Sequence, residues 1–318
     1  MEQMEDRSAA ARDPELARQI RRYQAEKRRR KRRRARAAHD LLVFALAAVF
    51  FLSAYKVGER LIMSRREQNT FAALAAVRAQ GRTESAAAPE NAPAPGGGAS
   101  PAEASAGSPS AAEETAAPAP ETAGERRPLP QYAQLHEMNG EFFGWLTVEA
   151  VGIDYPVMYS PERPEYYLYR DFNEKKTGSG TPFIDGRCPA DGNYYLIYGH
   201  LMENKTVFGR LPRFADEELW RENPRFRFDT VYEEREYEIV AAFYSRLYDA
   251  DDEGVFRYYD YFDLSDPAVF EEYMRQVREA ALYDTGVDAA WGDELLVLST
   301  CSRHDADGRF VLVAKRIK

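Results

Sequence analysis

The sequence contains only two cysteines, Cys188 and Cys301, and four histidines among its 318 residues. Two cysteines form at most one disulfide, so the composition excludes a disulfide-rich scaffold and a zinc site built from four cysteines. A glycine-rich phosphate loop, an HExxH pair, a GxSxG elbow and a dinucleotide fingerprint are also missing. At most, the chain has one disulfide or one reactive thiol.

Aromatic residues are absent between Thr83 and Arg127, and this stretch also lacks Leu, Ile, Val and Met. Ala, Pro, Gly and Ser make up most of it, so it cannot bury enough apolar surface to fold. Before it, residues 64–82 have helical character. We therefore expect residues 64–127 to form a membrane-proximal helix followed by a disordered linker.

The N-terminal region changes abruptly from basic to apolar. Residues 27–36 read KRRRKRRRAR, and the segment that follows, LLVFALAAVFFLSAY, carries no charge. A membrane-spanning helix needs about 20 residues, which residues 41–63 supply if the charges near their end lie at the outer interface. The positive-inside rule then predicts a cytoplasmic N-terminus at residues 1–40 and an extracellular remainder.

Each of these two segments has another interpretation. The basic run also fits a nucleic-acid patch, and the apolar run also fits a cleaved signal peptide. We favour the signal anchor because the charged leader is long for a secretory signal and no clear small-x-small cleavage site follows. The prediction is a single-pass membrane protein that binds no nucleic acid.

Residues 128–318 have the composition of a packed domain. Short aromatic and β-branched segments alternate there with turn residues, which is typical of strands. Residues 267–283 differ, because apolar side chains recur there at helical spacing after the N-cap candidate Asp266. This helical face comprises Val269, Phe270, Tyr273, Met274, Val277, Ala280 and Ala281. The pattern predicts a mainly β barrel or sandwich with peripheral helices. The eight strand segments are EFFGWLTVE, VGIDYPVMY, TPFID, NYYLIYG, FRFDTVY, YEIVAAFY, ELLVLST and RFVLVAKRI.

Two residues at strand ends, Cys301 and His200, could act together in nucleophilic catalysis. Cys301 ends the apolar strand ELLVLSTC, whereas Cys188 lies in a turn and fits a small buried hydrophobe. His200 follows the strand NYYLIYG and is our candidate acid and base; His304, three residues after Cys301, is the alternative. Arg309 begins the last strand, so a hairpin through the preceding Asp-Gly pair returns it beside Cys301. Its expected role is hydrogen bonding to a developing oxyanion.

Acidic turns at residues 249–253 and 305–308 do not have the spacing of a calcium-binding EF-hand, so we predict no metal and no cofactor.

At these residues the sequence resembles the class B sortases. LSTC resembles their TLxTC signature, with Val297 in place of the first Thr; IYGHLM resembles the histidine motif and DGRFVLVAKRI the arginine strand. Further similarity covers nearly all of residues 130–318, including GWL, IDYPV and YYLYRDF. One departure concerns the substrate site, because Arg163-Pro164 stands where class B members often have Asp-Asn.

The resemblance implies a closed eight-stranded sortase-type barrel and a cysteine transpeptidase. Cys301 is then the nucleophile that attacks the Thr carbonyl of a C-terminal sorting signal on a secreted protein. His200 then protonates the leaving amine, and Arg309 stabilises the oxyanion. The acceptor is an amine of a peptidoglycan cross-bridge or of its lipid-linked precursor. The substrate contacts implied in the same way are Ser299, Thr300 and Leu168.

Two other functions remain open from the sequence. A pilin-polymerising sortase uses the same chemistry with a lysine acceptor, and a non-catalytic, membrane-tethered binding domain uses the same scaffold. The presence of all three predicted catalytic residues argues against the non-catalytic alternative.

Overall fold

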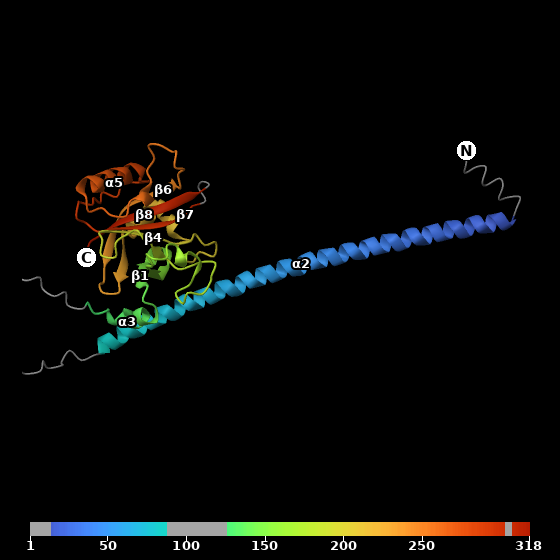
Figure 1. The fold of residues 1–318 in the computed structure, drawn as a ribbon, viewed down its shortest axis with the longest axis horizontal. Coiled ribbons are helices and arrows are strands. Elements are labelled where there is room, and N and C mark those ends of the chain that lie inside the picture. Colours follow the sequence, from blue (N-terminus) through green and yellow to red (C-terminus); the bar gives the residue numbers. More distant parts are fainter. Residues whose placement is uncertain (1–13, 88–125, 303–306) are drawn as a thin grey trace, which may run out of the picture. The chain divides into compact units, whose positions relative to one another are not determined.

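Strands pair edge to edge until the sheet closes on itself (Figure 1). The computed structural model describes residues 14–87, 126–302 and 307–318. The strands in these residues are β1 (Phe142–Val148), β2 (Ile153–Met158), β3 (Phe183–Ile184), β4 (Tyr194–Tyr198), β5 (Arg225–Thr230), β6 (Glu236–Arg246), β7 (Leu295–Cys301) and β8 (Gly308–Arg316). Around the barrel their order is β1, β2, β3, β4, β7, β8, β6, β5. The mainly β, closed eight-stranded barrel is therefore confirmed, and each strand overlaps one predicted segment.

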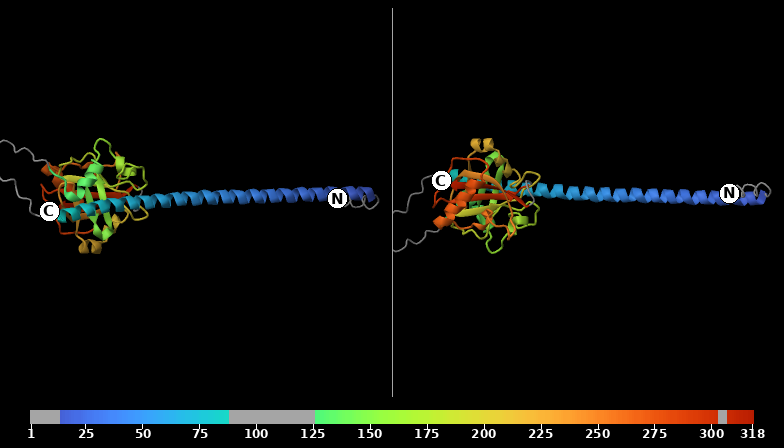
Figure 2. Two further views of the ribbon diagram at one scale, coloured as in Figure 1. Left: turned by 90° about the horizontal axis from the view of Figure 1, so that it is seen from below. Right: turned by 90° about the horizontal axis from the view of Figure 1, so that it is seen from above.

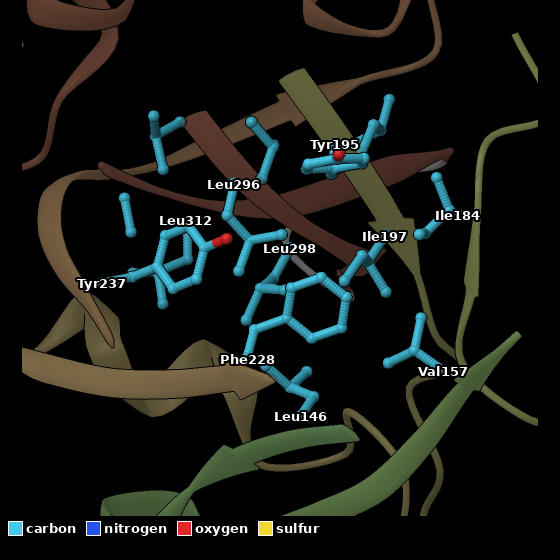
Figure 3. Close-up of a cluster of buried hydrophobic side chains, with 14 of the residues drawn as sticks. Leu146, Val157, Ile184, Tyr195, Ile197, Phe228, Tyr237, Leu296, Leu298 and Leu312 are labelled. Carbon is cyan, nitrogen blue, oxygen red and sulfur yellow. The ribbon is translucent and has the colours of Figure 1, made fainter. Parts of the chain in front are cut away.

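Alternate side chains of the strands fill the barrel interior. Figure 3 shows a cluster of these side chains, in which Leu146, Ile197, Phe228, Leu298 and Leu312 are all 0% exposed. Burying one such side chain contributes roughly 1.5–3 kcal/mol relative to leaving it in water. Since a slip of one residue would turn these side chains outward, the core fixes the register of the strands.

Helix α5 (Pro267–Ala280) packs on the outside of the barrel (Figure 1). The Asp266 side chain caps it by accepting hydrogen bonds from the Ala268 and Val269 N–H groups at 2.7 and 3.3 Å. Its buried residues are Phe270, Tyr273, Met274 and Val277. Val269, which the sequence placed on the same face, is 39% exposed because it lies at the edge of this stripe.

Two compact units divide the chain, residues 1–63 and 64–318. Helix α2 (Pro14–Ala87) contributes to both. Within the described residues, one helical segment, Leu41–Glu84, is long and apolar enough to cross a membrane. A signal sequence can have the same length and composition, so the spanning segment at residues 41–63 stays a prediction. Most of the predicted linker, residues 88–125, lies outside the described residues.

The last part of α2, residues 64–87, packs against the barrel. Phe71 and Leu74 are buried, and the Phe71 ring contacts the Tyr155 ring with centroids 4.7 Å apart. Arg78 lies over the Trp145 ring at 4.4 Å and forms a 3.1 Å ion pair with Asp154. The segment that the sequence assigned to a membrane-proximal helix is therefore also part of the compact unit.

Short helices complete this unit. They are α3 (Pro130–Met138), α4 (Glu217–Glu222) and the 3-10 helices η1 (Glu149–Val151), η2 (Tyr166–Tyr169), η3 (Leu211–Ala215) and η4 (Tyr258–Asp260). Figure 2 shows α2 ending beside α3. The close approach occurs at Gly81, where an added Cβ would lie 2.6 Å from the Pro130 carbonyl oxygen. We did not predict α3, whose buried Tyr132 donates a 2.6 Å hydrogen bond to Asp229.

Candidate active site

The parallel pair formed by β4 and β7 brings the two central candidates to one edge of the barrel. Tyr198 pairs with Ser299, and the Gly199 N–H donates a 3.1 Å hydrogen bond to the Ser299 carbonyl. Parallel strands end at the same edge of a sheet. His200, two residues after β4 ends, and Cys301, the last residue of β7, therefore lie at the same rim.

Strand periodicity also decides which face these side chains share. Leu298 points into the barrel, so alternation places Ser299 and Cys301 on the outer face. Cys301 pairs directly with Arg309 across the antiparallel β7 and β8. Opposite residues in such a pair have Cβ atoms about 5 Å apart on one face. The predicted hairpin therefore places Arg309 beside Cys301.

A cavity of about 590 Å³ lies at this rim. All six residues that the sequence singled out line it, namely Leu168, His200, Ser299, Thr300, Cys301 and Arg309. Its other lining residues are mainly aromatic, proline and glycine residues from the segments after β2, β3 and β6. The structure thus brings the candidates together, and their individual roles stay predictions.

The two cysteines lie in contrasting surroundings. Cys301 is exposed at the end of β7, where a substrate carbonyl can reach its sulfur. Cys188 is 1% exposed, and burial raises the pKa of its thiol to about 12. Since the thiolate is the nucleophilic form, Cys188 has almost none of it at neutral pH.

His200 is held by a backbone carbonyl. Its Nε2 lies 2.8 Å from the Leu168 carbonyl oxygen, and its ring centroid is 5.2 Å from that of Tyr169. A carbonyl oxygen only accepts hydrogen bonds, so Nε2 carries the proton and Nδ1 is the nitrogen that can exchange one. Burial lowers the pKa of His200 below its usual value, although the bond to Leu168 opposes this effect. The ring is therefore mainly neutral at pH 7.

Arg309 is oriented by the turn before β8. Its Nη1 donates hydrogen bonds to the carbonyl oxygens of Asp307 and Gly308 at 3.1 and 3.0 Å. The guanidinium has further N–H groups, on Nε and Nη2, with which it can bind a substrate oxygen. This arrangement suits the stabilisation of negative charge beside Cys301.

The predicted substrate contacts differ in their surroundings. Ser299 is buried, and its Oγ lies 2.7 Å from the Tyr258 hydroxyl, whose pKa burial raises to about 12. Thr300 is 2% exposed, and among the described residues its hydroxyl has no hydrogen-bond partner. Alternation places the Thr300 side chain on the opposite face from Cys301. Leu168 contributes its carbonyl oxygen to His200 as well as lining the cavity.

A polar cluster in the cavity wall was not predicted from the sequence. Asp185 accepts two hydrogen bonds from the Arg187 guanidinium at 3.0 and 2.7 Å and one from the Tyr198 hydroxyl at 3.2 Å. Arg187 also donates to the Tyr259 carbonyl at 2.8 Å, which joins β3 to the segment after β6. The sequence pattern could have indicated this cluster, because Asp185 directly follows a buried strand and Tyr198 directly precedes the Gly-His pair.

Two other predictions concern His304 and the absence of a metal. His304, the alternative to His200, lies outside the described residues. Among the described residues, no group of three or more His, Cys, Asp or Glu side chains is arranged to hold a metal ion. The absence of a metal and of a cofactor stays a prediction.

Comparisons with known proteins agree with this geometry. No protein-family model matches the sequence. Sortase B of Listeria monocytogenes is 28% identical over 187 residues, which cover 58% of this chain and 72% of that protein. The crystal structure of sortase B from Bacillus anthracis has a TM-score of 0.53 and 26% identity, covering 60% of this chain and 86% of that one. The crystal structure of Clostridium perfringens sortase B has a TM-score of 0.52 and 26% identity, and the match covers 58% of this chain and 98% of that one.

The lowered pKa of His200 predicts how stability depends on pH. The unfolded chain binds a proton at this histidine near pH 6.5, whereas the folded chain binds it only at lower pH. The contribution of His200 to the free energy of unfolding therefore falls as the pH drops below about 6.5. Denaturant unfolding at pH 7 and pH 5 should show a smaller loss for His200→Gln, which keeps a donor for Leu168. An equal loss in both proteins would contradict the assigned shift.

Proposed function

We propose that the chain, as a class B sortase and so a cysteine transpeptidase, attaches secreted proteins to peptidoglycan through an acyl-enzyme on Cys301. The observation that carries this proposal is the arrangement of Cys301, His200 and Arg309 around one cavity. A thiol, an imidazole and a guanidinium supply the nucleophile, the proton carrier and the oxyanion partner of acyl transfer.

The first half-reaction transfers the secreted protein to the enzyme. The Cys301 thiolate attacks the carbonyl carbon of Thr in the sorting signal, and Arg309 donates hydrogen bonds to the oxygen as it becomes negative. The thiol proton of Cys301 passes to Nδ1 of neutral His200, which gives it to the departing amine as the peptide bond breaks. The products are a thioester on Cys301 and the released C-terminal peptide.

The second half-reaction reverses these steps with a new amine. An amine of a peptidoglycan cross-bridge or of its lipid-linked precursor attacks the thioester, and neutral His200 accepts the proton at Nδ1. The lowered pKa of His200 supports this step, because the neutral imidazole predominates at pH 7. A new amide forms, and the Cys301 thiolate leaves.

Substrate preference is expected to differ from that of relatives with asparagine beside the cavity. Pro164, which stands at that place here, lines the cavity and has no side-chain donor. Its neighbour Arg163 forms a 2.6 Å ion pair with Glu141 and stacks over Tyr166. We therefore expect Pro164 to offer the substrate an apolar surface at the place where class B members often have asparagine.

The central test compares the two cysteines. Cys301→Ala should abolish cleavage after Thr in a mass-encoded peptide library with hydroxylamine as acceptor, since the alanine variant has no nucleophile. Cys188→Ala should keep activity within about twofold, because its buried thiol has no part in the reaction. Mass spectrometry should detect the acyl adduct only in chains that keep Cys301. Retained cleavage by Cys301→Ala would disprove the assignment of Cys301 as the nucleophile. A natural product joined to a lysine of another pilin would instead favour pilin polymerisation.

Arg309 is tested by charge-conserving substitution. Arg309→Lys keeps the positive charge but loses the planar fork, so kcat should fall about 10²- to 10³-fold, as for the loss of an oxyanion donor. Single-turnover kinetics of acylation provide the measurement, with exposed Arg275→Lys on α5 as the control. A loss confined to KM would instead assign Arg309 to ground-state binding.

The membrane topology is part of the same proposal. The basic residues 27–36 favour a cytoplasmic N-terminus, residues 41–63 form the anchor, and residues 64–127 with the catalytic domain at 128–318 lie outside. Protease added to intact cells should remove an epitope at the C-terminus and leave one at the N-terminus protected. Protection of the C-terminal epitope, with cleavage only after lysis, would contradict this orientation.

A further inference from the structure

Glu67 is a buried carboxylate that the proposed reaction does not use. It lies on the segment of α2 that packs against the barrel, and it is 7% exposed. Burying a carboxylate is unfavourable unless hydrogen bonds replace its lost hydration. Its Oε1 accepts hydrogen bonds from the Gly178 and Ser179 N–H groups at 2.9 and 3.4 Å. In the part of the chain that the structure describes, Glu67 forms no ion pair, so it binds this turn through the backbone.

The turn that Glu67 binds, residues 177–181, is paired with η2. The Thr177 N–H donates to the Tyr169 carbonyl, and the Thr181 N–H donates to the Tyr167 carbonyl, both at 3.0 Å. Between these bonds, Gly180 has φ +60° and lies so close to η2 that an added Cβ would be 2.2 Å from the Leu168 carbonyl oxygen. A shift of the turn therefore shifts the Leu168 carbonyl.

The Leu168 carbonyl is also the group that holds His200, with 2.8 Å between the oxygen and Nε2. Glu67 thus binds the 177–181 turn, and His200 binds η2, which is hydrogen-bonded to that turn. The turn and η2 together form one short backbone unit between the two side chains. Two threonine side chains strengthen the unit, because Thr177 Oγ1 accepts a hydrogen bond from the Gly180 N–H and Thr181 Oγ1 donates one to the Arg170 carbonyl, both at 3.0 Å.

We propose that Glu67 is a positioning residue for His200, acting through the 177–181 turn and the Leu168 carbonyl. This inference rests on the proposed function, because it gives the α2 segment a part in orienting the acid and base of that reaction. Loss of the carboxylate frees the turn, the Leu168 oxygen moves, and the imidazole loses its fixed tautomer and direction. Misplacement of a catalytic group by about 1 Å can cost a hundredfold in rate.

The experiment uses the full chain in detergent micelles with three variants. Glu67→Ala removes the acceptor, and Glu67→Gln keeps an acceptor oxygen without the charge. Phe71→Ala, on the same helix, removes the ring contact with Tyr155 and keeps the Glu67 carboxylate. Cleavage of the best peptide from a library with a central Thr gives kcat and KM. We expect kcat of Glu67→Ala to fall about 10- to 100-fold with KM little changed. Glu67→Gln should stay within about threefold of the wild type.

A second measurement does not depend on peptide cleavage. With four histidines in the chain, NMR can follow each imidazole during a pH titration, and His200→Gln identifies the His200 signal. In Glu67→Ala the pKa of His200 should rise toward its ordinary value of about 6.5, because water at the loosened ring removes the effect of burial, which is larger than the opposing effect of the Leu168 bond. In Glu67→Gln and Phe71→Ala it should stay at its wild-type value.

The outcomes separate this inference from the proposed function. Unchanged kcat and unchanged His200 titration in Glu67→Ala would overturn the positioning role, and so would equal effects in Phe71→Ala at matched loss of Tm. Failure of the wild type to cleave any peptide would count against the proposed function, while the titration would still decide the role of Glu67. If Glu67→Ala does not fold, Glu67→Asp, which withdraws the carboxylate by one methylene, should show an intermediate loss and titration shift.

Discussion

The parallel pairing of β4 with β7 is the constraint on which the candidate site depends. It carries two chain segments far apart in the sequence to one rim, where His200 and Cys301 follow the paired residues Tyr198 and Ser299. The closed barrel fixes this pairing from both sides, because β3 pairs with β4 and β8 pairs with β7. A one-residue slip of β7 would turn Cys301 toward the interior and expose Leu298, so the hydrophobic core also protects the geometry of the site.

The barrel places the reactive groups, but segments outside the strands orient them. The Leu168 carbonyl in η2 sets the direction and tautomer of His200, and the turn before β8 directs Arg309. The Asp185–Arg187 pair joins the wall after β3 to Tyr259. His200, Arg309 and Arg187 are each held by a rigid backbone carbonyl, so their orientation costs little conformational entropy when the substrate binds.

Residues near one another in the sequence were easier to predict than those brought together by the fold. The alternation of apolar and polar residues predicted the strands, and the short hairpin before the last strand predicted that Arg309 lies beside Cys301. The family resemblance implied a closed barrel, but the parallel pairing of β4 with β7 was not predicted, because strand patterns alone do not choose a neighbour. The bond from His200 to the Leu168 carbonyl has no sequence signature, since every residue carries that group. The packing of Phe71 was missed because an alanine-rich helix shows only a weak apolar face.

The charges around the cavity support the role that we propose for Arg309. Asp185 and Arg187 neutralise each other through a 2.7 Å ion pair, so neither contributes a full charge to the reaction. Arg309, by contrast, lies beside Cys301, and much of the remaining wall consists of aromatic, proline and glycine residues. Such a wall screens charge less than water does, which strengthens the attraction between the guanidinium and an oxyanion. Since His200 is mainly neutral at pH 7, in the proposed reaction Arg309 supplies the permanent positive charge at the place where negative charge would develop.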